Sequence, residues 1–177
     1  EQTNKGVVRN IMVRRGHYSH EMMIVLMTRT EKLPSSSEIV AEIEQSLPEV
    51  KSIVQNVNPE KTNALMGKKN KVLAGKSTIE DTLLGLKFDI SASSFYQVNP
   101  VQTEKLYDLA TKKADLSADD VVIDAYCGIG TISLSMARVA KQVYGVEIVP
   151  EAVEDAKKNA KLNNLTNVHF VTGKAET

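Results

Sequence analysis

The architecture of this chain is set by one run of residues, Val121-Val122-Ile123-Asp124-Ala125-Tyr126-Cys127-Gly128-Ile129-Gly130-Thr131. Four residues typical of a strand end in an acid, a Gly-x-Gly turn follows, and an apolar periodic run extends from Ile132 to Ala140. This order predicts a strand that leads into a helix through a loop with almost no side-chain bulk. A ligand can therefore lie against the backbone of the loop.

A second strand follows and ends in another acid. Residues 142–147 are typical of a strand, and Glu147 stands where a carboxylate commonly binds a ribose diol. Helical spacing then extends over 150–163, and a further strand is predicted over 168–171. Because strands and helices alternate, we expect parallel strands joined by right-handed crossovers. The glycine turn and the acidic strand ends together predict a nucleoside-binding half-site.

The spacing and charge of the turn indicate which nucleoside it binds. A dinucleotide site would have a third glycine three positions after Gly130, where this chain has Ser133. Asp124 at the strand end suits a cationic amino group better than it suits two phosphates. Both features favour S-adenosylmethionine, because its methionyl end is zwitterionic and carries no phosphate.

Each candidate residue also has a purely structural interpretation. Glu147 could be a solvated acid at a strand end, and Asp124 could be an acid stabilised by the dipole at a helix N-terminus. Tyr126 could equally be a packing aromatic, and Gln97 could cap a backbone group. The position of the two acids beside the turn favours ligand binding for them, whereas composition alone favours the capping role for Gln97.

The first ninety residues have a different pattern. Two β-rich runs, 7–13 and 22–29, predict an antiparallel hairpin. Apolar residues recur at helical spacing from Ile39 to Leu47 until Pro48 ends the pattern. Short strands are predicted at 52–57, 64–66, 71–74, 78–84 and 86–90. We therefore expect an α+β domain with one helix on an antiparallel sheet over residues 1–90, followed by a nucleotide-binding domain over 91–177.

Two basic segments of the first domain are candidates for contact with RNA. Residues 14–20 form the basic and aromatic tip of the hairpin, and Lys68-Lys69-Asn70-Lys71 is predicted to lie in a turn. Such segments are more often solvated turns than binding sites. The charge balance does not decide the matter, because residues 1–90 hold 13 basic and 11 acidic side chains, and residues 91–177 hold 9 and 11.

The composition is that of an ordinary globular protein, with 42% hydrophobic and 25% charged residues among 177. The longest apolar run, 22–27, is too short to cross a bilayer, and the amino end has no secretory pattern. We therefore expect a cytoplasmic protein without a membrane partner. Cys127 is the only cysteine, and the three histidines have no partner cysteines at zinc spacing, so no metal is expected.

Two motifs together resemble the RNA uracil-C5 methyltransferases, which form 5-methyluridine with S-adenosylmethionine. They are Ser94-Phe95-Tyr96-Gln97-Val98-Asn99-Pro100 and the turn at 124–131, and further similarity lies at 53–59, 63–67 and 147–163. The resemblance covers essentially the whole chain and is closest to the enzymes of 23S rRNA processing. It implies a Rossmann-like α/β methyltransferase domain, of which this chain holds the first half of the doubly wound sheet, preceded by an α+β central domain on the RNA side.

The resemblance also implies roles for particular residues. Gln97, Tyr126, Thr131 and Glu147 would line the S-adenosylmethionine pocket, with Glu147 on the ribose hydroxyls and Gly128 leaving room at the backbone. Thr131 stands where relatives often have asparagine. Residues 173–176 would edge the adenine.

The same resemblance implies chemistry that this chain does not supply. Family members add a cysteine thiolate to uracil C6, methylate the enolate at C5, and then remove the C5 proton with a base. Cys127 lies inside the cofactor turn, where a packed thiol is expected instead of a nucleophile. The nucleophile and the base are expected beyond Thr177, so we expect no catalytic residue here and an inactive fragment.

A shortened sheet has a structural consequence. The fold class has about seven strands, and the three expected here leave the strand from Val121 unpaired on one side. We expect that edge to be covered by a second copy of the chain or by a further part of the protein, or to be locally disordered. Two other functions remain open. One is a dinucleotide-dependent oxidoreductase, which Ser133 in place of glycine disfavours, and the other is a non-catalytic RNA-binding module.

Overall fold

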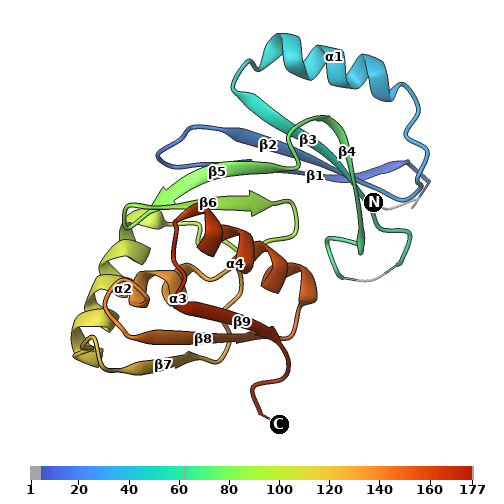
Figure 1. Ribbon diagram of the computed structural model, residues 1–177. Coiled ribbons are helices and arrows are strands. Elements are labelled where there is room, and N and C mark those ends of the chain that lie inside the picture. Colours follow the sequence, from blue (N-terminus) through green and yellow to red (C-terminus); the bar gives the residue numbers. More distant parts are fainter. Residues whose placement is uncertain (1–4, 62, 177) are drawn as a thin grey trace. The chain divides into compact units, whose positions relative to one another are not determined.

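The computed structural model describes residues 5–61 and 63–176 (Figure 1). Contacts divide the chain into two compact units. The first contains residues up to 79 together with 91–93, and the second contains 80–90 and the chain from 94 onward. The sequence placed the boundary after residue 90. Residues 80–90 instead group with the second unit, and the roles of the two domains stay predictions.

The first unit is a four-stranded sheet with one helix. Its strands are arranged in the order β1-β2-β3-β4. The elements are β1 (Val8–Arg15), β2 (Met22–Thr28), α1 (Ser36–Ser46), β3 (Val50–Val57) and β4 (Lys69–Gly75). The antiparallel hairpin predicted from the first two apolar runs is confirmed as β1 and β2. The sheet is nevertheless mixed, which corrects the purely antiparallel expectation, because α1 crosses over and makes β3 parallel to β2.

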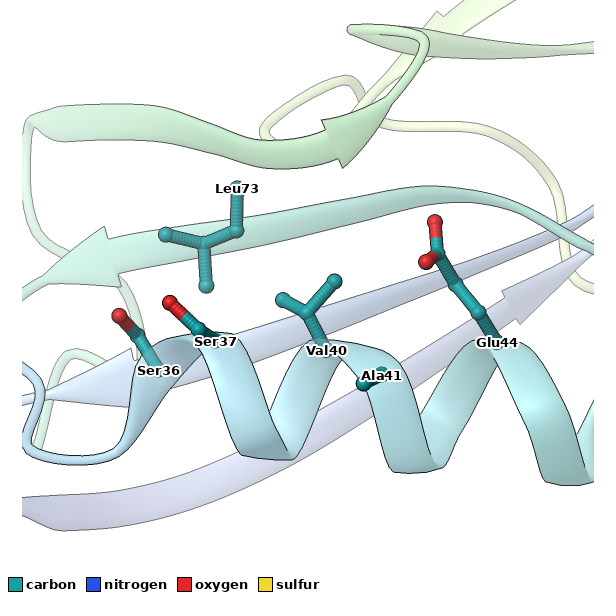
Figure 2. A pocket seen from close by; sticks show the side chains of 6 residues that line it. All are labelled: Ser36, Ser37, Val40, Ala41, Glu44 and Leu73. Atoms are coloured by element: carbon teal, nitrogen blue, oxygen red, sulfur yellow. The ribbon is translucent and has the colours of Figure 1, made fainter.

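The helix of this unit covers the sheet with a narrow apolar stripe. Ile39 and Ile43 of α1 pack against a buried cluster of Ile24, Leu26 and Leu33. A groove of about 270 Å³ lies between α1 and β4 (Figure 2). Its lining is aliphatic and hydroxyl-bearing with one acid, and consists of Ser36, Ser37, Val40, Ala41, Glu44 and Leu73. This composition is that of a packing groove and provides no set of groups for catalysis.

Two predictions for the segment after β3 were wrong, and buried side-chain amides explain both. Asn56 is fully buried and donates to Gly67 O at 2.9 Å and to Asn70 Oδ1 at 2.7 Å. Asn58 is also buried and donates to Ala64 O at 2.8 Å and to Leu65 O at 3.3 Å, and these bonds hold residues 64–66 in an irregular segment, where a strand was predicted. The bond from Asn56 to Asn70 accompanies the pairing of Asn70 with β3, so residues 69–71 belong to β4 and not to a turn.

The second unit alternates strands and helices, as predicted. Its elements are β5 (Thr78–Leu83), whose first two residues belong to the first unit, β6 (Leu86–Ser91), α2 (Pro100–Ala114), β7 (Val121–Asp124), α3 (Thr131–Met136), β8 (Gln142–Glu147), α4 (Pro150–Leu162) and β9 (Val168–Thr172). The strands β7, β8 and β9 form a parallel sheet in that order, and β5 and β6 form a separate two-stranded sheet. The parallel pairing predicted from the alternation is confirmed.

Helix α3 is shorter than the predicted span of 132–140. It ends at Met136, and the chain continues in turns as far as Ala140. The side-chain amide of Asn167 donates to Ala137 O at 2.8 Å and to Ala140 O at 3.0 Å. Since these carbonyls are satisfied by a side chain, the backbone need not continue the helix to pair them.

The two faces of the parallel sheet differ sharply. One face carries buried side chains such as Val143 and Phe170, and α3 and α4 contact the strands that bear them (Figure 1). On the opposite face Val121 is 58% exposed and Ile123 is 72% exposed. Within the described residues, β7 pairs only with β8. The sheet therefore has an apolar face and a strand edge that are open to solvent in this chain.

Candidate functional site

The turn between β7 and α3 adopts a backbone conformation that favours glycine. Gly128 and Gly130 both have positive φ values, +53° and +86°. A Cβ atom at Gly130 would lie 2.8 Å from the ring of Phe170, so the turn is both strained for other residues and closely packed at this point. A Cβ atom at Gly128 would have nothing within 4 Å, which leaves open space beside the backbone there.

The carboxylate of Glu147 lies against this turn. Its Oε2 accepts a hydrogen bond from Gly128 N at 3.1 Å, and its Oε1 accepts one from Val149 N at 3.0 Å. A backbone hydrogen bond from Cys127 N to Val146 O, 3.0 Å long, holds the two strand ends together. The structure thus brings together Glu147 and Gly128, the two residues on which the predicted half-site most depends.

Asp124 and Ser133 form a second polar contact at the turn. The Ser133 hydroxyl, fully buried on α3, donates to Oδ2 of Asp124 at the end of β7. The position that a dinucleotide fingerprint fills with glycine is therefore occupied by a side chain with a structural hydrogen bond. This contact weighs against the oxidoreductase alternative and fixes the direction of the Asp124 carboxylate.

Tyr126 and Thr131, two further predicted site residues, are each held by a partner from elsewhere in the chain. The exposed Tyr126 donates its hydroxyl to Glu176 Oε1 at 2.7 Å, and this hydrogen bond raises the pKa of Tyr126 and lowers the pKa of Glu176. Thr131 Oγ1 lies 3.0 Å from the hydroxyl of Tyr107 on α2. The segment predicted to edge the adenine therefore reaches the turn, because it carries Glu176.

Gln97 lies in the irregular segment between β6 and α2. Its side chain is half-buried, and Asn99 of the same segment caps α2 by accepting from Gln102 N at 3.1 Å. Among the described residues, the hydrogen bonds that the turn forms with Glu147, Glu176 and Tyr107 do not include Gln97. Glu147 and Gly128 are in direct contact, Tyr126 and Thr131 of the same turn bond to other partners, and the contact of all five predicted residues with a ligand stays a prediction.

Sequence reasoning missed three side chains near these residues. Tyr107 holds Thr131, Asn159 of α4 donates to Ile129 O in the turn, and Asp155 of α4 accepts from Ser94. All three are buried. Polar residues at helical spacing on an otherwise apolar face were the available signal, since a buried polar side chain needs a hydrogen-bond partner.

Cys127 has the environment of a packed thiol. It is 4% exposed, and its pKa is raised to about 12, first by burial and then by the nearby carboxylates of Asp124 and Glu147. A nucleophilic cysteine needs the opposite environment, which is exposed and electropositive. The expectation that Cys127 packs inside the turn agrees with this geometry.

We expect Cys127 to react with Ellman's reagent about a thousandfold more slowly than a free cysteine at about pH 8, because the pKa difference of 12 − 9 is three units. Unfolding exposes the Cys127 thiol and restores its ordinary pKa. The thiol is therefore deprotonated at a lower pH in the unfolded chain than in the folded chain. The free energy of unfolding should therefore fall as the pH rises between about 9 and about 12. Absorbance of the released dye measures the labelling rate, and urea titrations at several pH values measure the free energy of unfolding. Labelling as fast as in the urea-unfolded chain would contradict the buried environment.

Two features are absent from residues 5–61 and 63–176. No cluster of three or more His, Cys, Asp or Glu side chains that could hold a metal ion occurs there. In the same part of the chain, every helix is too short or too polar to cross a membrane.

The fold and the turn define a class of protein. Residues 116–177 match a family described as a methyltransferase domain. The chain also superimposes on the tRNA (uracil-54, C5)-methyltransferase of Pyrococcus abyssi in complex with S-adenosyl-L-homocysteine, with a TM-score of 0.78 and 24% identity over 98% of this chain and 41% of that one. The tRNA m1G37 methyltransferase of M. jannaschii is similar at a TM-score of 0.57 and 20% identity, over 98% of this chain and 49% of that one. The protein has a methyltransferase fold, and these matches support S-adenosylmethionine as its cofactor.

Curated relatives are considerably closer in sequence. A protein of Lactiplantibacillus plantarum named an uncharacterized RNA methyltransferase is 61% identical over 173 residues, which is 98% of this chain. A protein of Oceanobacillus iheyensis with the same description is 55% identical over 99% of this chain. This chain spans 38% of the length of each of these two relatives.

Proposed function

We propose that this chain is the cofactor half-site and RNA-side domain of an RNA methyltransferase that transfers a methyl group from S-adenosylmethionine to C5 of uridine in the cytoplasm. The observation that carries the proposal is the carboxylate of Glu147 lying on Gly128 N, 3.1 Å away, beside a turn that leaves open space at the backbone. An ionised acid held against a glycine turn is suited to the hydroxyl groups of an adenosine ribose, and its charge is unsuited to two phosphates.

Each end of the cofactor has a partner in this geometry. Each carboxylate oxygen of Glu147 can accept a second hydrogen bond, from a ribose hydroxyl, in addition to its present one. Asp124, directed by Ser133, is the acid that would face the methionyl ammonium group. Tyr126, Thr131 and Gln97 would complete the pocket wall.

The proposed substrate rests on different support. The relative in Lactiplantibacillus plantarum is named an RNA methyltransferase, and the structural neighbour in Pyrococcus abyssi acts on a tRNA uracil at C5. The motifs at 94–100 and 124–131 favour the enzymes of 23S rRNA. Because Cys127 is buried with a raised pKa, we propose that this 177-residue chain binds the cofactor but does not methylate RNA by itself.

Isothermal titration with S-adenosylhomocysteine and, separately, with NAD tests the proposal. We expect heat of binding with the first ligand only. Binding of NAD alone would overturn the proposal in favour of an oxidoreductase, and salt-dependent binding of RNA with neither ligand bound would favour a non-catalytic RNA-binding module. Transfer of radiolabelled methyl groups from S-adenosylmethionine to 23S rRNA should be absent, and transfer by the chain alone would contradict the proposed lack of a nucleophile.

We further propose that two copies of this chain associate through the β7 edge. Val121 and Ile123 are exposed on β7, and two such strands can pair across a twofold axis and bury these side chains. In sedimentation velocity, the native chain should form dimers, and the double variant Val121→Lys, Ile123→Lys should be monomeric. The control Val98→Lys changes a residue that is 98% exposed in another segment and should leave the dimer intact. A native chain that remains monomeric at high concentration would contradict this proposal.

A further inference from the structure

One amide on α4 contacts both sides of the candidate cofactor site. Asn159 is fully buried, its Oδ1 accepts from Asp89 N of β6 at 2.8 Å, and its Nδ2 donates to Ile129 O at 3.2 Å. Ile129 is the residue between the two glycines of the turn. A single side chain therefore connects the turn with strand β6, which leads into the segment that contains Gln97.

The turn needs an external anchor of this kind. Gly128 and Gly130 have backbone dihedral freedom that other residues lack, so the conformation of the turn is not fixed by its own side chains. The carbonyl of Ile129 points at Asn159, and this hydrogen bond fixes the peptide plane between the glycines. The orientation of Gly128 N–H toward Glu147 depends on the same short segment.

The opposite side of the site is anchored by the same helix. One turn before Asn159, Asp155 accepts a hydrogen bond from the hydroxyl of Ser94 at 3.0 Å. Ser94 opens the segment that carries Gln97, and Asp89 lies on the strand that leads to it. Polar side chains of α4 therefore hold both the turn and the Gln97 segment.

We propose that Asn159 is a positioning residue that sets the turn and the Gln97 segment at the separation the cofactor requires. The hydrogen bonds of Asn159 to the turn and to β6 are observed. The importance of these bonds for S-adenosylmethionine rests on the proposed function. Asn159 acts through Ile129 O and Asp89 N and does not itself need to touch the cofactor.

The same helix provides a matched control. Asn163 lies one turn further along, at the C-cap of α4, and its side chain accepts from Lys87 N at 2.8 Å and donates to Lys87 O at 2.7 Å. It joins α4 to β6 with the same chemical group as Asn159. Its other hydrogen bond stays within the helix, at Asn159 O, so it makes no contact with the turn. Both variants lose a side-chain contact between α4 and β6, and only Asn159→Ala also loses the hydrogen bond to Ile129.

The first measurement needs no cofactor, because Cys127 in the turn reports on its opening. We expect Asn159→Ala to raise the rate of labelling by Ellman's reagent about tenfold, as expected for loss of one directed hydrogen bond from the closed turn, and Asn163→Ala to leave it within about twofold. Equal rates in the two variants would overturn the inference. If circular dichroism shows that Asn159→Ala is unfolded, Asn159→Ser, which keeps a smaller polar group, replaces it in the same comparison.

The second measurement is titration with S-adenosylhomocysteine. Asn159→Ala should weaken binding about tenfold relative to the native chain, and Asn163→Ala less than about twofold. If the native chain does not bind the ligand, the proposed function fails while the labelling comparison still decides the role of Asn159 in the turn. If the native chain binds it and the two variants bind equally well, the positioning role is wrong.

Discussion

Replacing Glu147 by glutamine should weaken the binding of S-adenosylhomocysteine about a hundredfold, the largest loss expected from any single side chain in the candidate site. The native carboxylate already accepts from Gly128 N and Val149 N, and its remaining lone pairs would accept from the ribose hydroxyls. Hydrogen bonds to an ionised group contribute about 1.5–3 kcal/mol each, and 1.4 kcal/mol corresponds to a tenfold change in affinity. Isothermal titration measures the effect.

A neighbouring acid provides the control for this substitution. Glu151 is exposed in the first turn of α4, four residues further along the chain, and Glu151→Gln removes the same charge without touching the turn. Its effect on affinity should be less than about twofold. Equal losses in the two variants would show that the field of the acids, not contact with the ribose, favours the ligand.

Replacing Gly145 by alanine should lower the free energy of unfolding by about 2–3 kcal/mol, as typical for overpacking of a filled core. The added Cβ would lie 2.4 Å from Cδ1 of Phe170 and 2.9 Å from Sγ of Cys127. Both neighbours are buried, and Phe170 is held on β9 beside β8. Urea denaturation followed by circular dichroism measures the loss.

Two further variants establish the cause of that loss. Gly173→Ala places a Cβ 3.7 Å from Val146, an ordinary contact, and should change stability by less than about 0.5 kcal/mol. Adding Phe170→Leu to Gly145→Ala should cost less than the sum of the two single changes, because the smaller side chain relieves the overlap. Simple additivity of the two changes would contradict the steric explanation.

The features that could be predicted from the sequence depend on local signals. The alternation from residue 121 onward is confirmed, because the apolar spacing of each strand and helix is visible within a short segment. Asn99 and Pro100 stand at the start of α2, where a cap and a first-turn proline are favoured. The hairpin of β1 and β2 followed from two apolar runs of similar length. The expected meeting of Glu147 with the glycine turn required only that neighbouring parallel strands end at the same edge.

The features that could not be predicted depend on partners distant in the sequence. The amide of Asn167 satisfies Ala137 O and Ala140 O, 30 and 27 residues before it, where α3 ends early, and Asn56 bonds to Gly67 and Asn70, 11 and 14 residues after it. The parallel pairing of β2 with β3 depends on how α1 crosses the sheet, which hydrophobic spacing alone does not specify. In the candidate site, Asn159 was missed for the same reason, since its two partners lie 70 and 30 residues before it.

The sheet order β7-β8-β9 repeats the order of synthesis. Each new strand can pair with the strand synthesised just before it, and only one helix forms between the two strands. The loops closed at each step are short, which favours fast assembly with few opportunities for mispairing. The first unit follows the same rule, because its strand order β1-β2-β3-β4 is also the order of synthesis and only α1 lies between β2 and β3.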